Sequence, residues 1–389
     1  MSPVNQHFSL DEFDRRQAAL RKVLAEGTLD GLLLFKIEDI YWLSGLDTDG
    51  FCVFNAMYFG TEGGMTHISR TADLANIRYS SICDDIRVSV DAADNSRSAA
   101  IKDTLASHNM AGKRIGIQLD TMGLTPQLYL ELQAALAGWC ELVDASDMVR
   151  VLRLVKSPAE LAYIRRAGQI VNRCRDVAIA QTRPGVFEGD IMGRLWCKVF
   201  EEDGDPPAHR SPIGNGASAL NTRYTTRRKH IGEEDQVTFE LGAGYRHYHA
   251  ADMFVVLTGP RVDQRHRRMH EACCDALQAV QDKLRPGNTV GDLYEAHRST
   301  MARHGFEHAI LASCGYTMGA TWPPTWMEEP FIHAKNPVLL KPNMSFFTHM
   351  VLVDQNSGLT MSLGEQAIVT TGAPEIVTTV PREPIVVSH

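Results

Sequence analysis

One stretch, residues 237–259, constrains the fold of this chain more than any other. Apolar and polar residues alternate from residue 237 to residue 241, which is typical of a β-strand with one buried face. Gly242 and Gly244 interrupt the alternation and predict a turn at that point. The run 245–257 is rich in aromatic and β-branched residues and predicts the returning strand. The sequence therefore predicts a β-hairpin whose turn lies at the two glycines.

The predicted hairpin also carries many hydrogen-bonding side chains. Strand periodicity from the predicted turn places one group of them on one face and a second group on the other. The first group is Tyr245, His247 and His249, and the second is Arg246, Tyr248 and Asp252. Polar side chains are costly to bury unless they are bonded or used by a ligand. We therefore expect a functional site at this hairpin.

Composition narrows the class of function. The chain has 389 residues, of which 44% are hydrophobic, and a formal net charge of −8, which argues against nucleic acid or an anionic membrane as partner. It contains no 18-residue apolar run, so we expect no membrane span. The first ten residues lack the pattern of a signal peptide, and the eight cysteines are scattered, which favours a reducing cytoplasm. A small-molecule substrate is the expected partner.

The order of predicted elements indicates two domains. Strand and helix patterns alternate through residues 1–150, which predicts an α/β domain. Residues 147–156 are the expected linker. Ser157-Pro-Ala-Glu160 combines a capping serine, a proline and a glutamate three residues later, and so predicts the start of a long helix. We therefore expect a second domain over residues 157–389.

The second domain contains an internal repeat. Arg-Pro-Gly at 183–185 and Gly-Asp-Ile at 189–191 are matched by Arg-Pro-Gly at 285–287 and Gly-Asp-Leu at 291–293. Each copy follows a long helical pattern and precedes a second one, with strand-rich sequence after that. Two such units predict a pseudo-twofold domain, and a pocket between the halves is a common place for a site.

Several short motifs together resemble one known superfamily. They are Glu-Leu-Gly-Ala at 240–243, Tyr-Arg-His-Tyr-His at 245–249, Gly-Tyr-x-x-Gly at 315–319, Pro-Pro-x-Trp at 323–326 and Pro-Asn-Met-x-Phe at 342–346. They resemble the "pita-bread" enzymes, which include aminopeptidase P, prolidase and creatinase (peptidase family M24), and are most similar to the creatinase and ectoine hydrolase branch. The resemblance implies an α/β (α+β) chain with an N-terminal creatinase-type domain and a C-terminal pseudo-twofold pita-bread domain.

The resemblance also implies a homodimer. In this superfamily the N-terminal domain of one subunit completes the site of the other. Phe51 and Phe54 lie where that contact would fall and are expected to bind substrate, although core packing is the commoner role of such aromatic residues.

The peptidases of the superfamily bind two metal ions through two Asp, one His and two Glu. Carried over one at a time, these positions fall on Glu240, Ala251, Tyr316, His349 and Glu365. Only two of the five keep a carboxylate, and divalent ions need carboxylate clusters of this kind. The resemblance therefore implies no dinuclear centre and no cofactor, with a mononuclear site from Glu240, His349 and Glu365 as the alternative.

Asp252 lies one residue from the position of Ala251. In a regular strand it should face the opposite side of the sheet.

The same positions imply a metal-free chemistry. We expect Glu240, His249, His349 and Glu365 to be catalytic, with the carboxylates binding a cationic group and an imidazole activating water. The expected substrate-binding residues are Phe51, Phe54, Arg223, Tyr245, Tyr316 and Trp326. Arg223 would bind a substrate carboxylate, and it also occupies the place at which the family has a catalytic His. Together these residues predict hydrolysis of a non-peptide C–N bond in a small zwitterionic or cyclic amidine or guanidino compound.

Three alternatives remain open. The chain could be an Xaa-Pro-type metallopeptidase with a remodelled site, a lyase on the same fold, or a non-catalytic binding protein that retained the pocket. Glu240 and Glu365 could also form structural ion pairs with Arg223 or Arg246.

Overall fold

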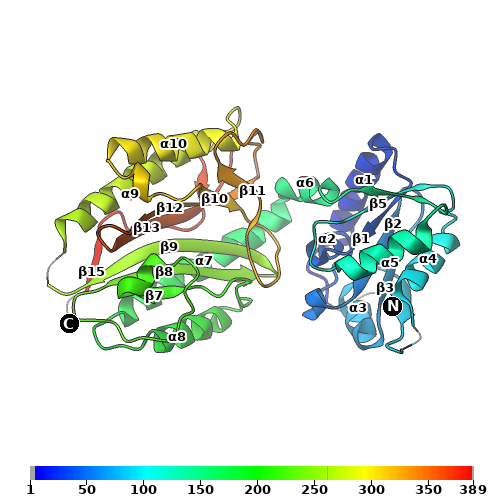
Figure 1. The fold of residues 1–389 in the computed structure, drawn as a ribbon, viewed down its shortest axis with the longest axis horizontal. Coiled ribbons are helices and arrows are strands. Elements are labelled where there is room, and N and C mark those ends of the chain that lie inside the picture. The colour runs from blue at the N-terminus through cyan, green and yellow to red at the C-terminus, as the bar shows by residue number, and fades with distance from the viewer. Residues whose placement is uncertain (1–4, 94, 261, 388–389) are drawn as a thin grey trace. The chain divides into compact units, whose positions relative to one another are not determined.

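The computed structural model describes residues 5–93, 95–260 and 262–387. The chain divides into two compact units, residues 1–153 and residues 154–389 (Figure 1). The sequence placed a linker over residues 147–156, but most of that stretch is a helix, α6 (Met148–Leu154). Within the described ranges, no helix has the length and apolar character needed to cross a membrane.

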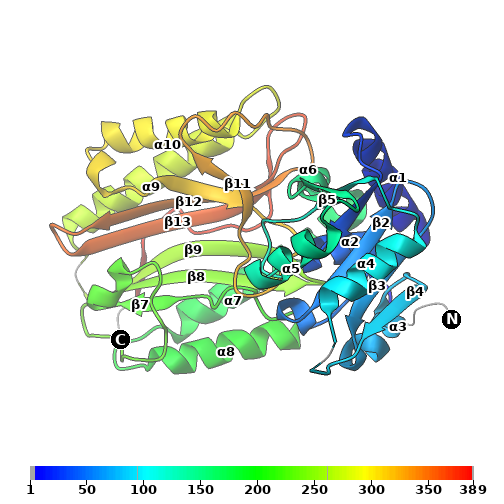
Figure 2. The same cartoon turned by 45° about the vertical axis from the view of Figure 1, so that its right-hand side comes forward.

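The N-terminal unit is a mixed sheet with helices around it, as the alternating pattern predicted (Figure 2). Its described strands follow the order β4-β3-β2-β1-β5-β6, with β1 parallel to β5 and antiparallel to β2. The strands are β1 (Gly31–Leu34), β2 (Asn55–Gly60), β3 (Met65–Arg70), β4 (Asp85–Ser89), β5 (Arg114–Ile117) and β6 (Glu141–Asp144). The helices are α1 (Leu10–Glu26), α2 (Ile37–Ser44), α3 (Leu74–Ser80), α4 (Arg97–Ser107) and α5 (Pro126–Leu136), with short 3-10 turns η1 (Gly50–Cys52) and η2 (Thr71–Asp73).

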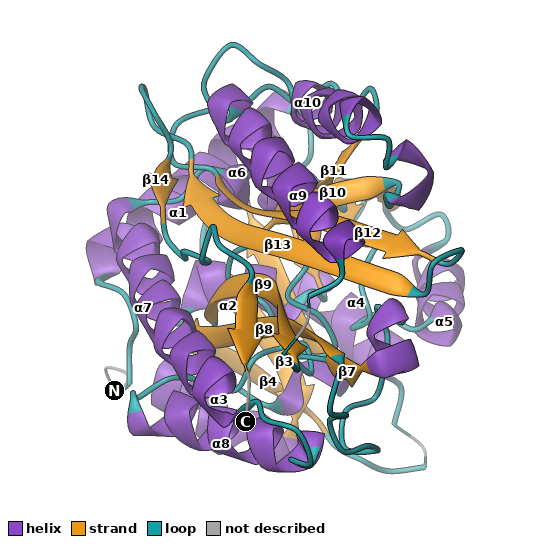
Figure 3. Ribbon diagram, turned by 90° about the vertical axis from the view of Figure 1, so that its left-hand side faces the viewer, coloured by secondary structure: helices purple, strands orange, loops and turns teal. Residues whose placement is uncertain are grey.

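The C-terminal unit is one curved sheet with helices packed on one face (Figure 3). Its described strands follow the order β11-β10-β12-β13-β9-β8-β7, while β14 pairs with β13 and β15 with β9. The strands are β7 (Ile213–Asn215), β8 (Gln236–Tyr245), β9 (Tyr248–Thr258), β10 (Ser313–Thr317), β11 (Glu328–His333), β12 (Ser345–Asp354), β13 (Leu359–Ile368), β14 (Glu375–Ile376) and β15 (Ile385–Val387). The helices are α7 (Pro158–Gln181), α8 (Glu188–Glu201), α9 (Gln264–Lys283) and α10 (Val290–Arg303), with 3-10 turns η3 (Gly216–Leu220) and η4 (Glu307–Ala309).

The internal repeat corresponds to two helix pairs, each followed by strands, and this prediction is confirmed. Helices α7 and α8 are joined through Gly185, and α9 and α10 through Gly287, both with positive φ (+81° and +95°). The capping box at Ser157 starts α7 as expected. Apolar residues of α7, α9 and the sheet form the main core of this unit, so the helices cover one face and leave the other for a site.

The central hairpin is present, but the predicted position of its turn is wrong. β8 and β9 are joined by Arg246 and His247, which have φ of +53° and +65°, as in the hairpin turns with two left-handed residues. Gly242 lies inside β8 for a packing reason, because a Cβ there would lie 2.3 Å from Cζ3 of Trp326.

Because the turn lies elsewhere, the predicted sharing of faces within the hairpin is also wrong. Tyr245 pairs with Tyr248, and both lie on the helix-covered face, whereas Gly244 pairs with His249 on the opposite face. Leu241 pairs with Asp252, so Asp252 does face away from Ala251, as predicted.

Candidate functional site

The face of the C-terminal sheet opposite the helices gathers several of the predicted site residues. Strand pairing places Glu240 opposite Met253, Met253 opposite Gly364, and Gly364 opposite His349. Tyr316 pairs with Phe347 on the next strand. A small apolar cluster lines the same region and consists of Ala208, Ala251, Tyr316, Met318, Trp326 and Phe347. We call this region the open face of the sheet.

Glu240 stands at the end of a directed chain of hydrogen bonds. Trp326 Nε1 donates to the Tyr316 hydroxyl at 2.8 Å, and that hydroxyl donates to Oε1 of Glu240 at 3.3 Å. An indole nitrogen can only donate, so the single proton of the Tyr316 hydroxyl is left to point at the carboxyl group. Trp326 and Tyr316 are both buried, so these two hydrogen bonds fix the position of Glu240 from the interior of the domain.

The carboxyl group of Glu240 titrates near neutrality. Burial raises the pKa of Glu240 to about 7, although the hydrogen bond from Tyr316 and the charge of Arg223 both act to lower it. A carboxyl group with such a pKa is populated in both protonation states at neutral pH, which suits proton transfer.

His349 forms part of the floor of the open face. Its ring centroid lies 5.6 Å from that of Tyr316 and 5.5 Å from that of Phe347. Burial lowers the pKa of His349 to about 4, so the imidazole is neutral at neutral pH. The side chain is only 8% exposed and its Nδ1 has no hydrogen-bond partner among the described residues. A buried nitrogen of this kind is expected to be satisfied by a ligand or a water molecule.

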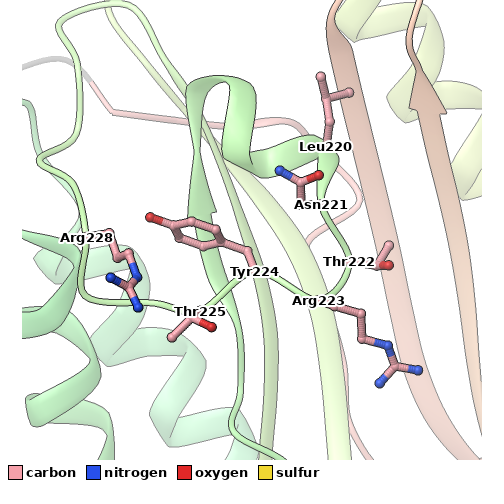
Figure 4. A pocket seen from close by; sticks show the side chains of 7 residues that line it. All are labelled: Leu220, Asn221, Thr222, Arg223, Tyr224, Thr225 and Arg228. Carbon is pink, nitrogen blue, oxygen red and sulfur yellow. The ribbon is translucent and has the colours of Figure 1, made fainter.

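Arg223 supplies a cation beside this group. It lies on the exposed loop after η3, and its charge acts on both Glu240 and His209. Figure 4 shows Arg223 and Arg228 projecting at opposite ends of a hollow, with Tyr224 between them. The lining residues are Leu220, Asn221, Thr222, Arg223, Tyr224, Thr225 and Arg228.

Comparison with known proteins identifies the family. Residues 162–371 match the model of metallopeptidase family M24, and residues 16–155 match the creatinase/prolidase N-terminal domain. The chain belongs to the M24 family. The predicted pita-bread fold and resemblance are thereby confirmed.

Several relatives align with this chain over almost its whole length. It is 27% identical over 98% of its length to an uncharacterized hydrolase/peptidase of Sinorhizobium fredii (98% of that protein). It is 24% identical over 98% of its length to an ectoine hydrolase of Halomonas elongata (99% of that protein). The solved dipeptidase PepE of Mycobacterium ulcerans superposes with a TM-score of 0.85 at 22% identity, covering 98% of this chain and 100% of that one.

The prediction that Glu365 shares a pocket with Glu240 and His349 is wrong. His349 pairs with Gly364, whereas Glu365 pairs with Thr348 and therefore lies on the helix-covered face. Glu365 is 1% exposed and is held by the three donors Gln281 Nε2 (2.7 Å), Arg382 Nη2 (2.8 Å) and the backbone N–H of Val380 (2.8 Å). Glu365 is therefore in a structural ion pair, but its partner is Arg382 and not Arg223 or Arg246, the two arginines that the sequence suggested.

His249 lies on the open face, but both of its ring nitrogens are engaged. Nε2 accepts the backbone N–H of Ala208 at 2.9 Å, and Nδ1 lies 3.1 Å from the Thr321 hydroxyl. Burial lowers the pKa of His249 to about 4. In this conformation its imidazole holds Ala208 in place and has no free nitrogen for proton transfer.

Three further predicted binding residues, Tyr245, Phe51 and Phe54, belong to other elements of the two units. Tyr245 is on the helix-covered face, with its ring 5.7 Å from that of Tyr163. Phe54 belongs to the core of the N-terminal unit and is 5% exposed, and Phe51 lies in η1 of the same unit. Phe54 therefore takes the core role that aromatic residues most often have.

The open face does not fit the two-metal centre of the M24 peptidases. Of the five ligand positions, Ala251 has no donor atom, the hydroxyl of Tyr316 is engaged as a hydrogen-bond donor to Glu240, and Glu365 faces the other way. In the part of the chain that the structure describes, no group of three or more His, Cys, Asp or Glu residues is arranged to hold a metal ion. The mononuclear alternative loses Glu365 for the same reason.

One residue of the site was missed by the sequence. His209, between α8 and β7, lies with its ring centroid 5.1 Å from that of Trp326 in an edge-on contact. It belongs to no motif and sits in an irregular segment, so neither periodicity nor spacing could mark it. Only the contact with Trp326, more than a hundred residues along the chain, brings it to the site.

Proposed function

We propose that this M24 chain hydrolyses a non-peptide C–N bond in a small zwitterion, and that it does so without a metal ion. The observation that carries this proposal is Glu240, a carboxyl group with a pKa of about 7 held by Tyr316 on a face whose metal positions lack their ligands. The 24% identity to an ectoine hydrolase over 98% of the chain supports the substrate class.

The charges of the site match such a substrate. Arg223 binds the carboxylate of the zwitterion through its guanidinium group, which suits planar anions. The charge of Arg223 acts on the pKa of Glu240, which supports binding of the two ends of one small molecule by these two groups. The carboxyl group of Glu240 hydrogen-bonds the nitrogen-bearing end, and the neutral ring of His349 packs in the floor beside it.

Glu240 is the proton donor to the leaving nitrogen in this proposal. Breaking a C–N bond requires protonation of the nitrogen, because an amide anion is a very poor leaving group. Burial keeps Glu240 partly protonated at neutral pH, and Tyr316 binds one carboxyl oxygen so that the other can face the substrate. The Tyr316 hydrogen bond also stabilises the carboxylate that remains after the transfer.

The test combines metal analysis with a substrate panel. The purified protein is assayed for bound metal, and turnover of ectoine, creatine and Xaa-Pro dipeptides is followed before and after chelation. We expect turnover of a small zwitterion that survives chelation and falls at least about a hundredfold in Glu240→Gln. Chelator-sensitive cleavage of the dipeptides would instead identify a remodelled metallopeptidase, and tight binding without turnover would identify a binding protein.

A further inference from the structure

The segment between α8 and β7 brings an imidazole to the open face beside Trp326. Ala208 belongs to the apolar cluster that contains Tyr316 and Trp326, and its N–H is fixed by His249 at 2.9 Å. The next residue, His209, is thereby held in a T-shaped contact with Trp326, with ring centroids 5.1 Å apart and an interplanar angle of 75°. The buried residues Ala208 and Trp326 therefore fix the position of the His209 side chain, although His209 lies in a loop.

The contacts of His209 determine which nitrogen is free. Its Nδ1 lies 3.5 Å from the carbonyl oxygen of Pro324, at the long limit of a hydrogen bond. A carbonyl oxygen can only accept, so Nδ1 carries the proton and Nε2 keeps its lone pair. Burial first, and then the charge of Arg223, lower the pKa of His209 below its usual value, while the Pro324 contact acts in the opposite direction. His209 is therefore a neutral imidazole with a basic nitrogen available.

The guanidinium group of Arg223 acts on His209 as well as on the other groups of the site. Burial dominates the pKa shifts of Glu240, Tyr316 and His209, and the charge of Arg223 contributes to all three. Coulomb interactions fall with distance, so a charge that acts on three groups is near each of them. A molecule bound to Arg223 would therefore lie near Glu240 and near His209.

Among the imidazoles of His209, His249 and His349, that of His209 combines a free basic nitrogen with a partly exposed position. Both nitrogens of His249 are engaged, and His349 is almost completely buried in the floor. Hydrolysis also needs a group to take a proton from the attacking water, and Glu240 cannot be that group while it is the proton donor.

We propose that His209 is the general base that activates water in this reaction, a role that rests on the hydrolase function proposed above. Nε2 of His209 takes one proton from water while the water oxygen bonds to the unsaturated substrate carbon, whose π electron pair moves onto the other heteroatom attached to that carbon. The same pair re-forms the double bond when the leaving nitrogen departs. The C–N bond then breaks, and its electron pair leaves with the nitrogen, which receives the proton of Glu240. Return of the proton from the His209 imidazolium to the Glu240 carboxylate restores the site, so one water is consumed for each bond broken.

Chemical rescue tests the role directly. We expect His209→Ala to lower kcat on the turned-over substrate by about a hundredfold to ten-thousandfold, with KM changed by less than about threefold. Added imidazole should restore part of kcat in His209→Ala, because a small base can enter the space left by the side chain. The control His333→Ala removes an exposed imidazole on β11 and should leave kcat unchanged. A loss that imidazole does not restore, or a rise in KM alone, would overturn the assignment.

A second measurement does not depend on turnover. Nitrogen-15 NMR of the histidine side chains, assigned with His209→Gln, reports protonation and tautomer at neutral pH. We expect His209 neutral with the proton on Nδ1, and a shift of its Nε2 signal when ectoine or creatine is added. A protonated ring, a proton on Nε2, or no response to either compound would refute the role of His209. If the wild-type protein turns over nothing in the panel, the proposed hydrolase function fails, and the NMR result still decides on His209.

Discussion

At the scale of single residues, the site depends on the direction of two hydrogen bonds, from Trp326 to Tyr316 and from Tyr316 to Glu240. Trp326 can only donate, so Tyr316 must direct its own proton to Glu240, and the carboxyl group is left with one bound and one available oxygen. Burial raises the pKa of Glu240, and Tyr316 limits the rise. The buried residue Tyr316 therefore controls the strength of Glu240 as an acid.

Tyr316→Phe should move the alkaline limb of the pH–rate profile. The hydrogen bond from Tyr316 lowers the pKa of Glu240, so its loss raises that pKa above the wild-type value of about 7. Glu240 then stays protonated to higher pH, and the alkaline limb of kcat/KM moves upward. The rate at the optimum should fall about tenfold, the equivalent of one hydrogen bond to a charged group.

The matched control for this change is Tyr248→Phe. It removes another Tyr–Glu hydrogen bond, the 2.7 Å contact with Glu160, from the helix-covered face of the same hairpin. Its pH profile should keep the wild-type shape even where stability changes. If the alkaline limb of kcat/KM is unchanged in Tyr316→Phe, the ionisation of Glu240 does not control the rate.

At the scale of elements, the sequence predicted what is locally determined. The capping box at Ser157 starts α7 as expected, because the interactions that form it lie within four residues. The strands of the hairpin were also predicted from alternation. The turn was not, because Gly242 resembles a turn residue but is required inside β8 by Trp326, which lies 84 positions later in the chain.

The side of the sheet taken by each site residue was equally hard to predict. His349 and Glu365 lie in the paired strands β12 and β13, and a one-residue difference in the pairing of these strands decides which face Glu365 takes. Register is a property of the assembled sheet and leaves no local signal. His209 was missed for a related reason, since only tertiary packing brings its loop to Trp326.

Gly242→Ala tests the packing of β8 against the Pro-Pro-x-Trp segment. The added methyl would meet the Trp326 ring at 2.3–2.8 Å, so the ring must move and its hydrogen bond to Tyr316 is lost. We expect a stability loss of about 1–3 kcal/mol, as in other overpacked cores, together with a fall in kcat of at least about tenfold. Denaturant melts and steady-state kinetics measure the two effects.

Two further variants make the test specific. Gly244→Ala, in the same strand, places its methyl 3.2 Å from Cβ of Asp205 and should lower kcat much less. Trp326→Phe removes the indole N–H by itself, so combining it with Gly242→Ala should cost less than the sum of the single losses. Additive losses would show that Gly242 does not act through Trp326.

At the scale of the whole molecule, the two faces of the C-terminal sheet separate function from stability. The open face carries Glu240, whereas the carboxyl groups of Glu365 and Asp252 are buried on the helix-covered face. Glu365 is fully bonded, but neither oxygen of Asp252 has a hydrogen-bond partner among the described residues, and Nη1 of Arg175 lies 3.9 Å away. Burial raises the pKa of Asp252 well above its usual value of 3.8.

This carboxyl group should make the stability of the protein depend on pH. The pKa of Asp252 is higher in the folded than in the unfolded protein, so between these two values the folded state binds more protons. The free energy of unfolding therefore falls as the pH rises from about 4 toward neutrality and above. An asparagine side chain does not titrate, so the substitution Asp252→Asn should remove this dependence. We expect the melting temperature of the variant to exceed that of the wild type by an amount that grows with pH. The difference should reach about 3–8 °C at mildly alkaline pH, the equivalent of one buried unsatisfied polar group.

Calorimetry across the pH range measures this difference in melting temperature. The control is Glu271→Gln, which neutralises an exposed carboxylate on α9 and should follow the wild type at every pH. Because the unfolded chain loses its proton from residue 252 near pH 4, a difference caused by burial of this carboxyl group must widen above that pH. A difference that stays constant or shrinks with rising pH would mean that Asp252 is ionised and stabilised between the sheet and α7.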